Sequence, residues 1–253
     1  MTETRKAAIH ALLKGIETGD PEAVRVVNED EYIQHNPQTR EGNEGLAALF
    51  KRISASNPKV NIVRLFSDGD YVFGHTEYDF ATRRIGFEVF RFEGEQAVEH
   101  WDNIQPRIEP TASGRTMVDG PTLAGDLPLT EANRALVQQF VEDVLIAARP
   151  ERIGKFVAPK CAQHSPAMED GIGGIAAMLS SKIDGAAEQS YTRLHRILAE
   201  GSFVLAVIEG LKRGEDASFY MLFRVADGLI SEQWQTSEIV PPRDQWLNQN
   251  GKF

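Results

Sequence analysis

Hydrophobic and polar positions change their spacing along the first 105 residues. Residues 2–19 place apolar side chains at helical spacing, and Gly19 is expected to end that helix. A second, short helix is predicted at 20–27, with Asp20 as its N-cap, and a third at 44–56. The period then becomes that of strands, which are predicted at 59–66, 71–80, 85–93 and 96–105. Helices followed by antiparallel strands predict an α+β domain whose helices pack on one face of a curled sheet.

The same order of elements occurs twice in the chain. "YIQHNPQTREGNEGLAALF" (32–50) aligns with "CAQHSPAMEDGIGGIAAML" (161–179), and "FRFEGEQAVEHWD" aligns with "FRVADGLISEQWQ" further on. Matching blocks in the same order predict two homologous domains. We expect the first domain at 1–108, a Pro- and Gly-rich linker at 109–129, and the second domain at 130–253.

Charge and cysteine usage narrow the class of partner and compartment. The net charge of -10 argues against nucleic acid or an anionic membrane as a partner. No apolar run is long enough to span a bilayer, and residues 1–20 lack the pattern of a signal peptide. Cys161 is the only cysteine, which excludes an internal disulfide, and we expect a cytoplasmic protein. Cys161 aligns with Tyr32, and packing is its expected role.

Alternation along the strands groups the residues that could carry chemistry. Residues two apart share a face, so His100 and Asp102 lie together while Trp101 faces the other way. His75 shares a strand face with Phe73, and His35 ends a strand-like segment. Several of these groups could converge on a pocket between the concave face of the sheet and the helices. The residues expected to line a ligand there are Tyr32, Phe73, Phe87, His100 and Trp101.

Four blocks in the first copy resemble those of a known family. "YIQHNP", "DGDYVFGH", "EHWDNIQP" and "TMVDGPT" are similar in order and spacing to the SnoaL-like branch of the NTF2-like superfamily. The resemblance implies a cone-shaped α+β fold, and it loosely implies polyketide cyclase or isomerase chemistry. It puts the acid–base role on Asp102, matches His75 to the strand histidine of the family, and gives His35 a pocket-lining, orienting role. A carboxylate facing apolar walls loses hydration, which makes it a stronger base for a proton next to a carbonyl.

The second copy acts as an internal control. Asp102 corresponds to Gln235, and His100 corresponds to Gln233. Glutamine cannot exchange a proton at neutral pH, so the second copy is predicted to be inactive. His164 keeps the place of His35, which favours a structural role for this histidine. Trp101 and Trp234 occupy the same place in the two copies, and packing is the simpler explanation of this repetition.

Each functional interpretation has a structural alternative. Asp102 could be a strand carboxylate held by a hydrogen bond, and His75 a satisfied pocket histidine. The spacing His100-x-Asp102 resembles part of an iron-binding triad, but the signal is weak, and neither a metal nor another cofactor is expected. No nucleophile elbow is present in the sequence.

The sequence therefore predicts a cofactor-independent enzyme of the lyase or isomerase class. Its first domain would bind a small, apolar, carbonyl-containing compound, with Asp102 as base assisted by His75 and His35, for aldol cyclisation or isomerisation. A non-catalytic ligand-binding or scaffold protein of the same fold is the alternative, and hydrolysis or dehydration by the same carboxylate with a water is a third option. The two domains are expected to form an intramolecular pseudo-dimer through their sheets, and further oligomerisation stays open.

Overall fold

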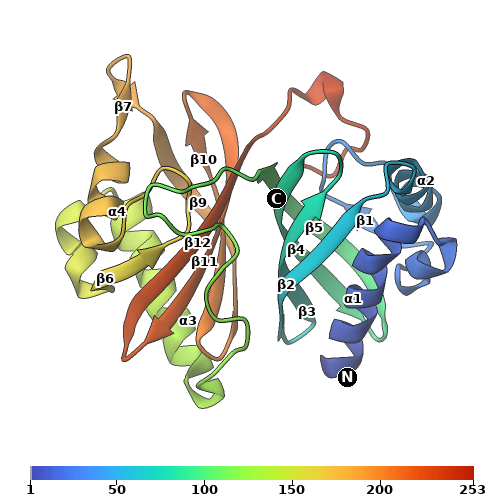
Figure 1. Ribbon diagram of the computed structural model, residues 1–253, viewed down its shortest axis with the longest axis horizontal. Helices are drawn as coiled ribbons and strands as arrows, with labels where there is room; N and C mark the ends of the chain where they lie inside the picture. The colour runs from blue at the N-terminus through green and yellow to red at the C-terminus, as the bar shows by residue number, and fades with distance from the viewer. Residues whose placement is uncertain (1) are drawn as a thin grey trace. The chain divides into compact units, whose positions relative to one another are not determined.

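The computed structural model describes residues 2–253 and divides the chain into two compact units (Figure 1). The first unit holds the residues up to Pro106 together with Pro241–Phe253, and the second holds Arg107–Val240. Two segments therefore lie elsewhere than the sequence predicts. The linker residues from 107 onward form part of the second unit, and residues 241–253, which we call the C-terminal tail, form part of the first.

Three helical segments open the first domain: α1 (Thr2–Thr18), the 3-10 helix η1 (Pro21–Val26) and α2 (Gly42–Ser54). Helix α1 ends where Gly19 adopts a φ of 68°, a conformation that costs glycine little. The side chain of Asp20 then caps η1 by accepting a hydrogen bond from the Glu22 amide. These features confirm the predicted stop at Gly19 and the predicted cap at Asp20, whereas α2 begins and ends two residues earlier than the predicted 44–56.

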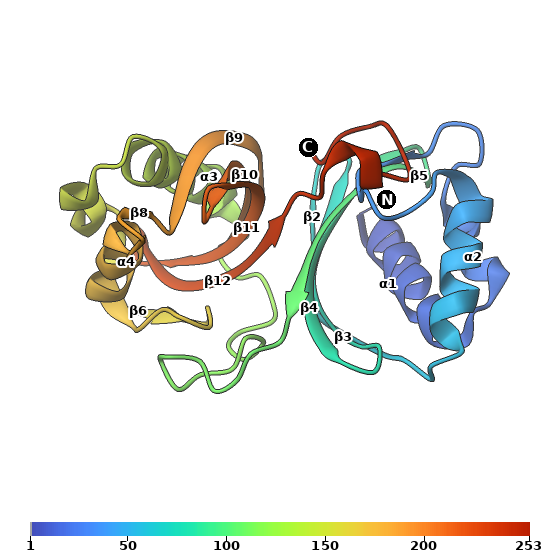
Figure 2. The same cartoon turned by 90° about the horizontal axis from the view of Figure 1, so that it is seen from above.

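The first sheet has five strands: β1 (Ile33–Gln34), β2 (Lys59–Asp68), β3 (Tyr71–Asp79), β4 (Arg83–Glu93) and β5 (Gln96–Pro106). Their order is β1-β5-β4-β3-β2, with β1 parallel to β5 and the other pairs antiparallel. Helices α1 and α2 lie on the same side of this sheet (Figure 2). Apolar side chains from the helices, such as Leu12 and Phe50, form the core with Phe90 and Phe92 of β4.

The second domain repeats this plan. Its helices are η2 (Leu127–Leu129), α3 (Thr130–Phe140), the π-helix η3 (Val141–Ile146), η4 (Pro150–Lys155) and α4 (Gly171–Ser180). Its main strands are β6 (Val157–Gln163), β9 (Gln189–Glu200), β10 (Phe203–Lys212), β11 (Glu215–Ala226) and β12 (Leu229–Ile239). They take the order β6-β12-β11-β10-β9, again with one parallel pair.

Three short elements complete the structure: β7 (Lys182–Ile183), β8 (Ala186–Ala187) and η5 (Arg243–Gln245). The prediction of two α+β domains with mostly antiparallel sheets is confirmed. Among residues 2–253, no helix is both long and apolar enough to cross a membrane.

Candidate active site

A cavity of about 190 Å³ lies inside the first domain, between the concave face of the sheet and helices α1 and α2. Apolar side chains of the helices form one wall. Apart from Arg52 of α2, the polar and ionisable side chains come from the other wall and from the segment around β1. Those polar and ionisable groups are Tyr32, Gln34, Asn36, Gln38, Thr39, Arg52, Tyr78, Glu88, His100 and Asp102.

Strand register explains why three ionisable groups meet at this wall. Glu88 on β4 lies directly opposite Asp102 on β5, and Phe90 lies opposite His100. Residues two apart on a strand point to the same face, so all four side chains turn toward the cavity. Glu88, His100 and Asp102 are each at least nine-tenths buried. Buried ionisable groups need specific partners, which identify the state of each group.

His100 and Glu88 share a proton. The Gln34 side-chain oxygen accepts from the Asn36 amide at 2.9 Å, which fixes the orientation of the Gln34 amide. His100 Nδ1 lies 3.0 Å from that oxygen and must therefore donate to it. His100 Nε2 lies 2.8 Å from Glu88 Oε2, a contact that needs one further proton between the two atoms. One proton therefore lies in the hydrogen bond between His100 and Glu88, at the wall of the cavity.

Asp102 is held by two donors. Asn36 Nδ2 donates to Asp102 Oδ2 at 2.7 Å, and the Asn36 oxygen accepts from the Gln38 amide, which fixes the orientation of the Asn36 side chain. Lys252 Nζ, from the C-terminal tail, lies 3.5 Å from Asp102 Oδ1. A carboxylate with these partners keeps acceptor capacity toward the cavity, which a proton-abstracting base requires.

Two tyrosine hydroxyls at the cavity are proton donors. Burial, followed by the negative charges of Asp102 and Glu88, holds the pKa of Tyr32 well above its ordinary value. Burial and Glu88 raise the pKa of Tyr78 in the same way, and the Tyr78 hydroxyl donates to Glu88 Oε1 at 2.6 Å. The Tyr32 hydroxyl is buried near the Gln34 amide but forms no hydrogen bond of good geometry within residues 2–253. Tyr32 can therefore donate to a ligand.

The structure does not bring His75 together with Asp102. His75 on β3 lies opposite Phe87 on β4, and Phe87 lies opposite Asn103, so this row turns away from the cavity. His75 stacks on Phe87 at 4.5 Å, and its Nδ1 contacts an Arg64 nitrogen at 2.9 Å. The prediction that His75 and Asp102 converge on one pocket is wrong. His75 lies in register with Phe87 and Asn103, whose side chains point to the opposite face of the sheet from Asp102.

Phe73 shares this outer face with His75, so neither it nor Phe87 lines the cavity. Of the five residues predicted to contact a ligand, Tyr32 and His100 do line the cavity, and Trp101 does not. Trp101 is the neighbour of His100 on β5, so its side chain points to the opposite face, where it is buried.

His35 also lies on the outer face, where it forms a cluster with Trp101, Glu99 and Arg91. The His35 ring stacks on Trp101 at 4.7 Å, and His35 Nε2 lies 2.9 Å from Glu99 Oε1. Arg91 donates to the second oxygen of Glu99 at 2.7 Å. Burial of Glu99 opposes ionisation, but hydrogen bonds from His35 and Arg91 outweigh it and lower the pKa of Glu99. His35 Nδ1 faces the Gly251 carbonyl at 3.1 Å, so both ring nitrogens are engaged on the outer face and neither points into the cavity.

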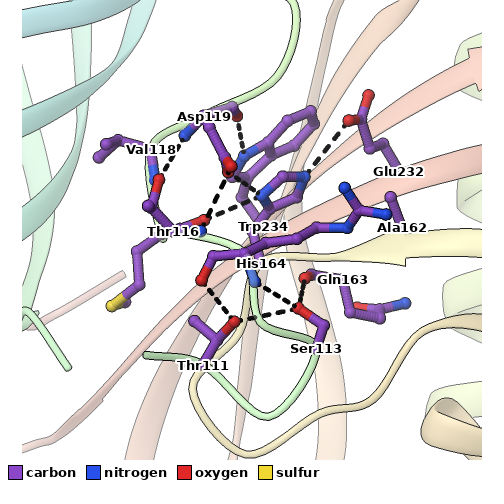
Figure 3. A network of polar contacts seen from close by, with 12 residues as sticks. Thr111, Ser113, Thr116, Val118, Asp119, Ala162, Gln163, His164, Glu232 and Trp234 are labelled. Carbon is purple, nitrogen blue, oxygen red and sulfur yellow. Dashed lines mark hydrogen bonds and ion pairs between the residues drawn. The ribbon is translucent and has the colours of Figure 1, made fainter. Parts of the chain in front are cut away.

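The second domain repeats this outer-face cluster around His164, which stacks on Trp234 at 4.5 Å (Figure 3). His164 Nε2 contacts Glu232, and Arg224 donates to the same carboxylate at 2.7 Å. His164 Nδ1 faces the Thr116 carbonyl at 2.9 Å and Asp119 Oδ1 at 2.6 Å, a carboxylate contact that His35 Nδ1 does not make within residues 2–253. The histidine thus anchors a returning segment in both domains, which supports the structural role inferred from its repetition.

The inner face of the second sheet lacks the ionisable groups of the first. Gln235 stands in place of Asp102, and Met221, directly opposite Gln235, stands in place of Glu88. Met221 and Cys161 are fully buried in the apolar core. Burial, aided by the charge of Glu232, raises the pKa of the Cys161 thiol to about 12, so packing is its role and not nucleophilic chemistry.

Glu88, His100 and Asp102 are the group best placed to hold a metal ion, since one ligand atom from each lies within 4.8 Å of the others. Their present partners suit that role poorly. Both Glu88 oxygens already pair with Tyr78 and His100, and the ammonium of Lys252 stands beside Asp102. A cation there would replace these bonds and be repelled by the lysine.

Sequence reasoning missed four residues of the site: Gln34, Asn36, Glu88 and Lys252. Glu88 carried a usable signal, because it is the one carboxylate inside the otherwise apolar run "IGFEVF". Gln34 and Asn36 flank His35 in "QHNP", and alternation sends them inward where it sends His35 outward. Lys252 carried no local signal.

Comparisons with known proteins agree with the repeat. The sequence model of one family, described as "SnoaL-like domain", matches residues 9–100 and 137–233. Among curated proteins, none matches this sequence significantly.

Solved structures resemble parts of the chain at low identity. A Kribbella flavida protein proposed to be a ketosteroid isomerase is 19% identical and has a TM-score of 0.38, over 48% of this chain and 91% of its own. IdmH of Streptomyces antibioticus, proposed to be a polyketide cyclase, is 16% identical with a TM-score of 0.35, over 40% and 91%. An LEH-like epoxide hydrolase of M. tuberculosis is 19% identical with a TM-score of 0.36, over 41% and 84%.

Proposed function

The chain belongs to the SnoaL-like family, with two copies of an NTF2-like domain, and we propose that its first domain catalyses proton abstraction next to a carbonyl. The observation that carries the proposal is the wall of the first-domain cavity. It brings Asp102, the Tyr32 hydroxyl and the His100–Glu88 pair to one otherwise largely apolar space. A base, a neutral donor and a second proton store are the groups that such chemistry needs.

Each group has a defined task in the proposed reaction. The Asp102 carboxylate takes the α-proton, and the electron pair of the C–H bond moves into an enolate. The Tyr32 hydroxyl donates to the enolate oxygen and stabilises its charge in a site of low polarity. Returning the proton to another carbon gives isomerisation. Attack of the enolate carbon on a second carbonyl gives an aldol product, whose alkoxide takes a proton from Asp102 or from the His100–Glu88 pair.

The substrate class follows from the lining. Apolar side chains of α1 and α2, among them Leu12, Ile16 and Phe50, cover the wall facing the ionisable groups. A small, largely hydrocarbon ketone fits this arrangement, with its carbonyl toward Tyr32. His75 and His35, which the sequence had suggested as assistants, have no part in this scheme because they face away from the cavity.

Deuterium exchange tests the reaction without knowledge of the natural substrate. α-Tetralone and trans-2-decalone would be incubated with the protein in D₂O, and loss of the α-proton signals followed by ¹H NMR. We expect faster exchange than in buffer, and a loss of about 10²–10⁴-fold of that acceleration in Asp102→Asn, since this variant keeps the shape but not the base. Gln235→Asn, at the corresponding place in the second domain, is the matched control and should leave exchange unchanged.

The binding alternative makes a different prediction in the same samples. A scaffold that only binds would show saturation-transfer signals from the ketones without exchange above buffer. Equal exchange in wild type and Asp102→Asn would also contradict the proposal, because the base would then be elsewhere.

A further inference from the structure

The C-terminal tail brings a buried lysine to the first-domain site. Lys252 is 3% exposed, and its ammonium lies 3.5 Å from Asp102 Oδ1, on the carboxylate oxygen that Asn36 does not occupy. A lysine is seldom buried to this extent unless its charge is compensated. The tail therefore places a charged group beside the one carboxylate to which the proposed function assigns the base.

Specific hydrogen bonds fix the position of the tail. The Asn248 side chain donates to the Asn36 carbonyl at 2.7 Å, and the Asn250 side chain donates to the Gln34 carbonyl at 3.1 Å. Asn36 and Gln34 are the residues whose side chains orient Asp102 and His100. The segment 34–36 thus orients Asp102 and His100 through its side chains and binds the tail through its backbone carbonyls.

The second domain contains a counterpart of the tail, which fixes the equivalence of residues. The Leu247 amide donates to the Pro37 carbonyl, as the Ala112 amide donates to the Pro166 carbonyl. The carbonyl of Gly251 faces His35, as that of Thr116 faces His164 (Figure 3 shows the second of these contacts). Both pairs of tail residues are separated by 135 positions (247 − 112 and 251 − 116), so the two segments run in the same register.

This register makes Met117 the equivalent of Lys252. Met117 is 2% exposed, so both positions are buried to the same degree. The charged residues Asp102 and Lys252 of the first domain therefore correspond to two neutral residues of the second, Gln235 and Met117. The domain that lacks the carboxylate lacks the ammonium as well, although the fold accommodates either side chain at this place.

From this correspondence we infer that Lys252 is a positioning residue of the first-domain site. It holds the Asp102 side chain in its cavity-facing position, and the tail that carries it is part of the site. The inference rests on the proposed function for its effect on turnover, but the pairing itself can be tested without a substrate. Lys252 does not line the cavity and acts only through Asp102.

A double-mutant cycle in urea unfolding tests the pairing. We expect Lys252→Met, which copies Met117, to lower the folding equilibrium constant about tenfold or more, and Asp102→Asn to do the same, because each removes one member of a buried pair of opposite charges. The double variant should be more stable than either single variant. Arg243→Met removes a positive charge from an exposed part of the same tail and should change stability little.

Turnover gives the second measurement, with the deuterium exchange described above. Lys252→Met should lower kcat about tenfold with KM changed less than about twofold, and Lys252→Arg should restore most of it. Arg243→Met should leave kcat and KM unchanged, because Arg243 lies on an exposed part of the tail.

The outcomes separate the inference from the proposed function. Additive effects in the cycle would overturn the inference whatever the turnover. Coupling in the cycle without exchange in the wild type would support the pairing and remove the proposed reaction. Coupling together with a wild-type kcat in Lys252→Met would overturn the positioning role. If Lys252→Met does not fold, Lys252→Gln takes its place in the cycle.

Discussion

The two domains keep the same outer-face cluster and differ at the inner face. On the outer face, a histidine stacked on a tryptophan and paired with a glutamate anchors a returning segment in each domain, through His35 in the first and His164 in the second. On the inner face, Glu88 and Asp102 of the first sheet give way to Met221 and Gln235. The shared outer-face cluster therefore has a structural role in both domains. The ionisable groups of the inner face have a role in the first domain only.

The two domains also differ in how much of their interior is apolar packing and how much is buried charge. The first domain keeps a cavity beside Glu88, His100 and Asp102, each with fixed partners. The second has Met221, Gln233 and Gln235 at the corresponding positions, none of them charged, and Met221 belongs to a continuous apolar core. Apolar packing contributes stability, whereas buried charges contribute it only when they are fully paired. The first domain therefore carries the site at a cost in packing.

Exchanging the residues at one position between the two domains should give the largest effects on stability. Met221→Glu places a carboxylate in the packed core with neither the histidine nor the tyrosine that Glu88 has. We expect a loss of about 3–5 kcal/mol in the free energy of unfolding. Glu88→Met leaves His100 and Tyr78 without an acceptor and should cost less, about 1–3 kcal/mol. Urea unfolding followed by circular dichroism measures both.

Met221→Gln is the control for this exchange, since it adds polarity at the same place without charge. It should cost less than Met221→Glu. Equal costs for Met221→Glu and Glu88→Met would contradict the comparison, because the second interior would then tolerate a carboxylate as well as the first does.

Much of the fold could be predicted because its signals are local. Period changes along the chain, the stop at Gly19 and the cap at Asp20 depend on neighbouring residues, and the structure places the elements accordingly. The repeat needed only alignment of the chain with itself. Asp102, Tyr32 and His100 could be connected with a cavity for the same reason, since strand alternation and the helical wall are both readable from sequence.

The register of β4 against β5 could not be predicted in this way. The pairing runs Glu93 to Gln96 at the turn, but a bulge between Arg91 and Phe92 shifts it by one residue. Counting from the turn without the bulge would place Glu88 opposite Trp101 instead of Asp102. A one-residue shift reverses the face assignment, and the sequence does not mark the bulge. Lys252 was out of reach because its position depends on tertiary contacts of the tail.

Acid should weaken the outer-face clusters of both domains alike. Hydrogen bonds from a histidine and an arginine outweigh burial and lower the pKa of Glu99, and the same causes lower that of Glu232, below the ordinary 4.5. A lowered carboxyl pKa stabilises the folded state above that ordinary value, and the stabilisation is lost as pH falls through the lowered value. Glu99→Gln and Glu232→Gln should each cost about 1–3 kcal/mol at pH 7.

Thermal unfolding between pH 7 and pH 3 would follow this loss. The difference in unfolding free energy between wild type and each variant should shrink below about pH 4.5, where the wild type loses its carboxylate as well. A difference that stays constant with pH would show that the two carboxylates do not hold their clusters through charge. A response in one domain only would show that the clusters are not equivalent.

The smallest effect is expected at Cys161, which stands where the first domain has Tyr32. The thiol is fully buried and burial raises its pKa to about 12, so almost no thiolate exists at pH 8. Ellman's reagent should leave the folded protein unmodified and label it at the rate of unfolding once urea is added. Cys161→Ala should leave ketone exchange unchanged, whereas Tyr32→Phe should slow it about tenfold or more through loss of the donor. Rapid labelling of the folded protein would mean that the interior of the second domain is open to the reagent. Slowed ketone exchange in Cys161→Ala would mean that the second domain takes part in the chemistry.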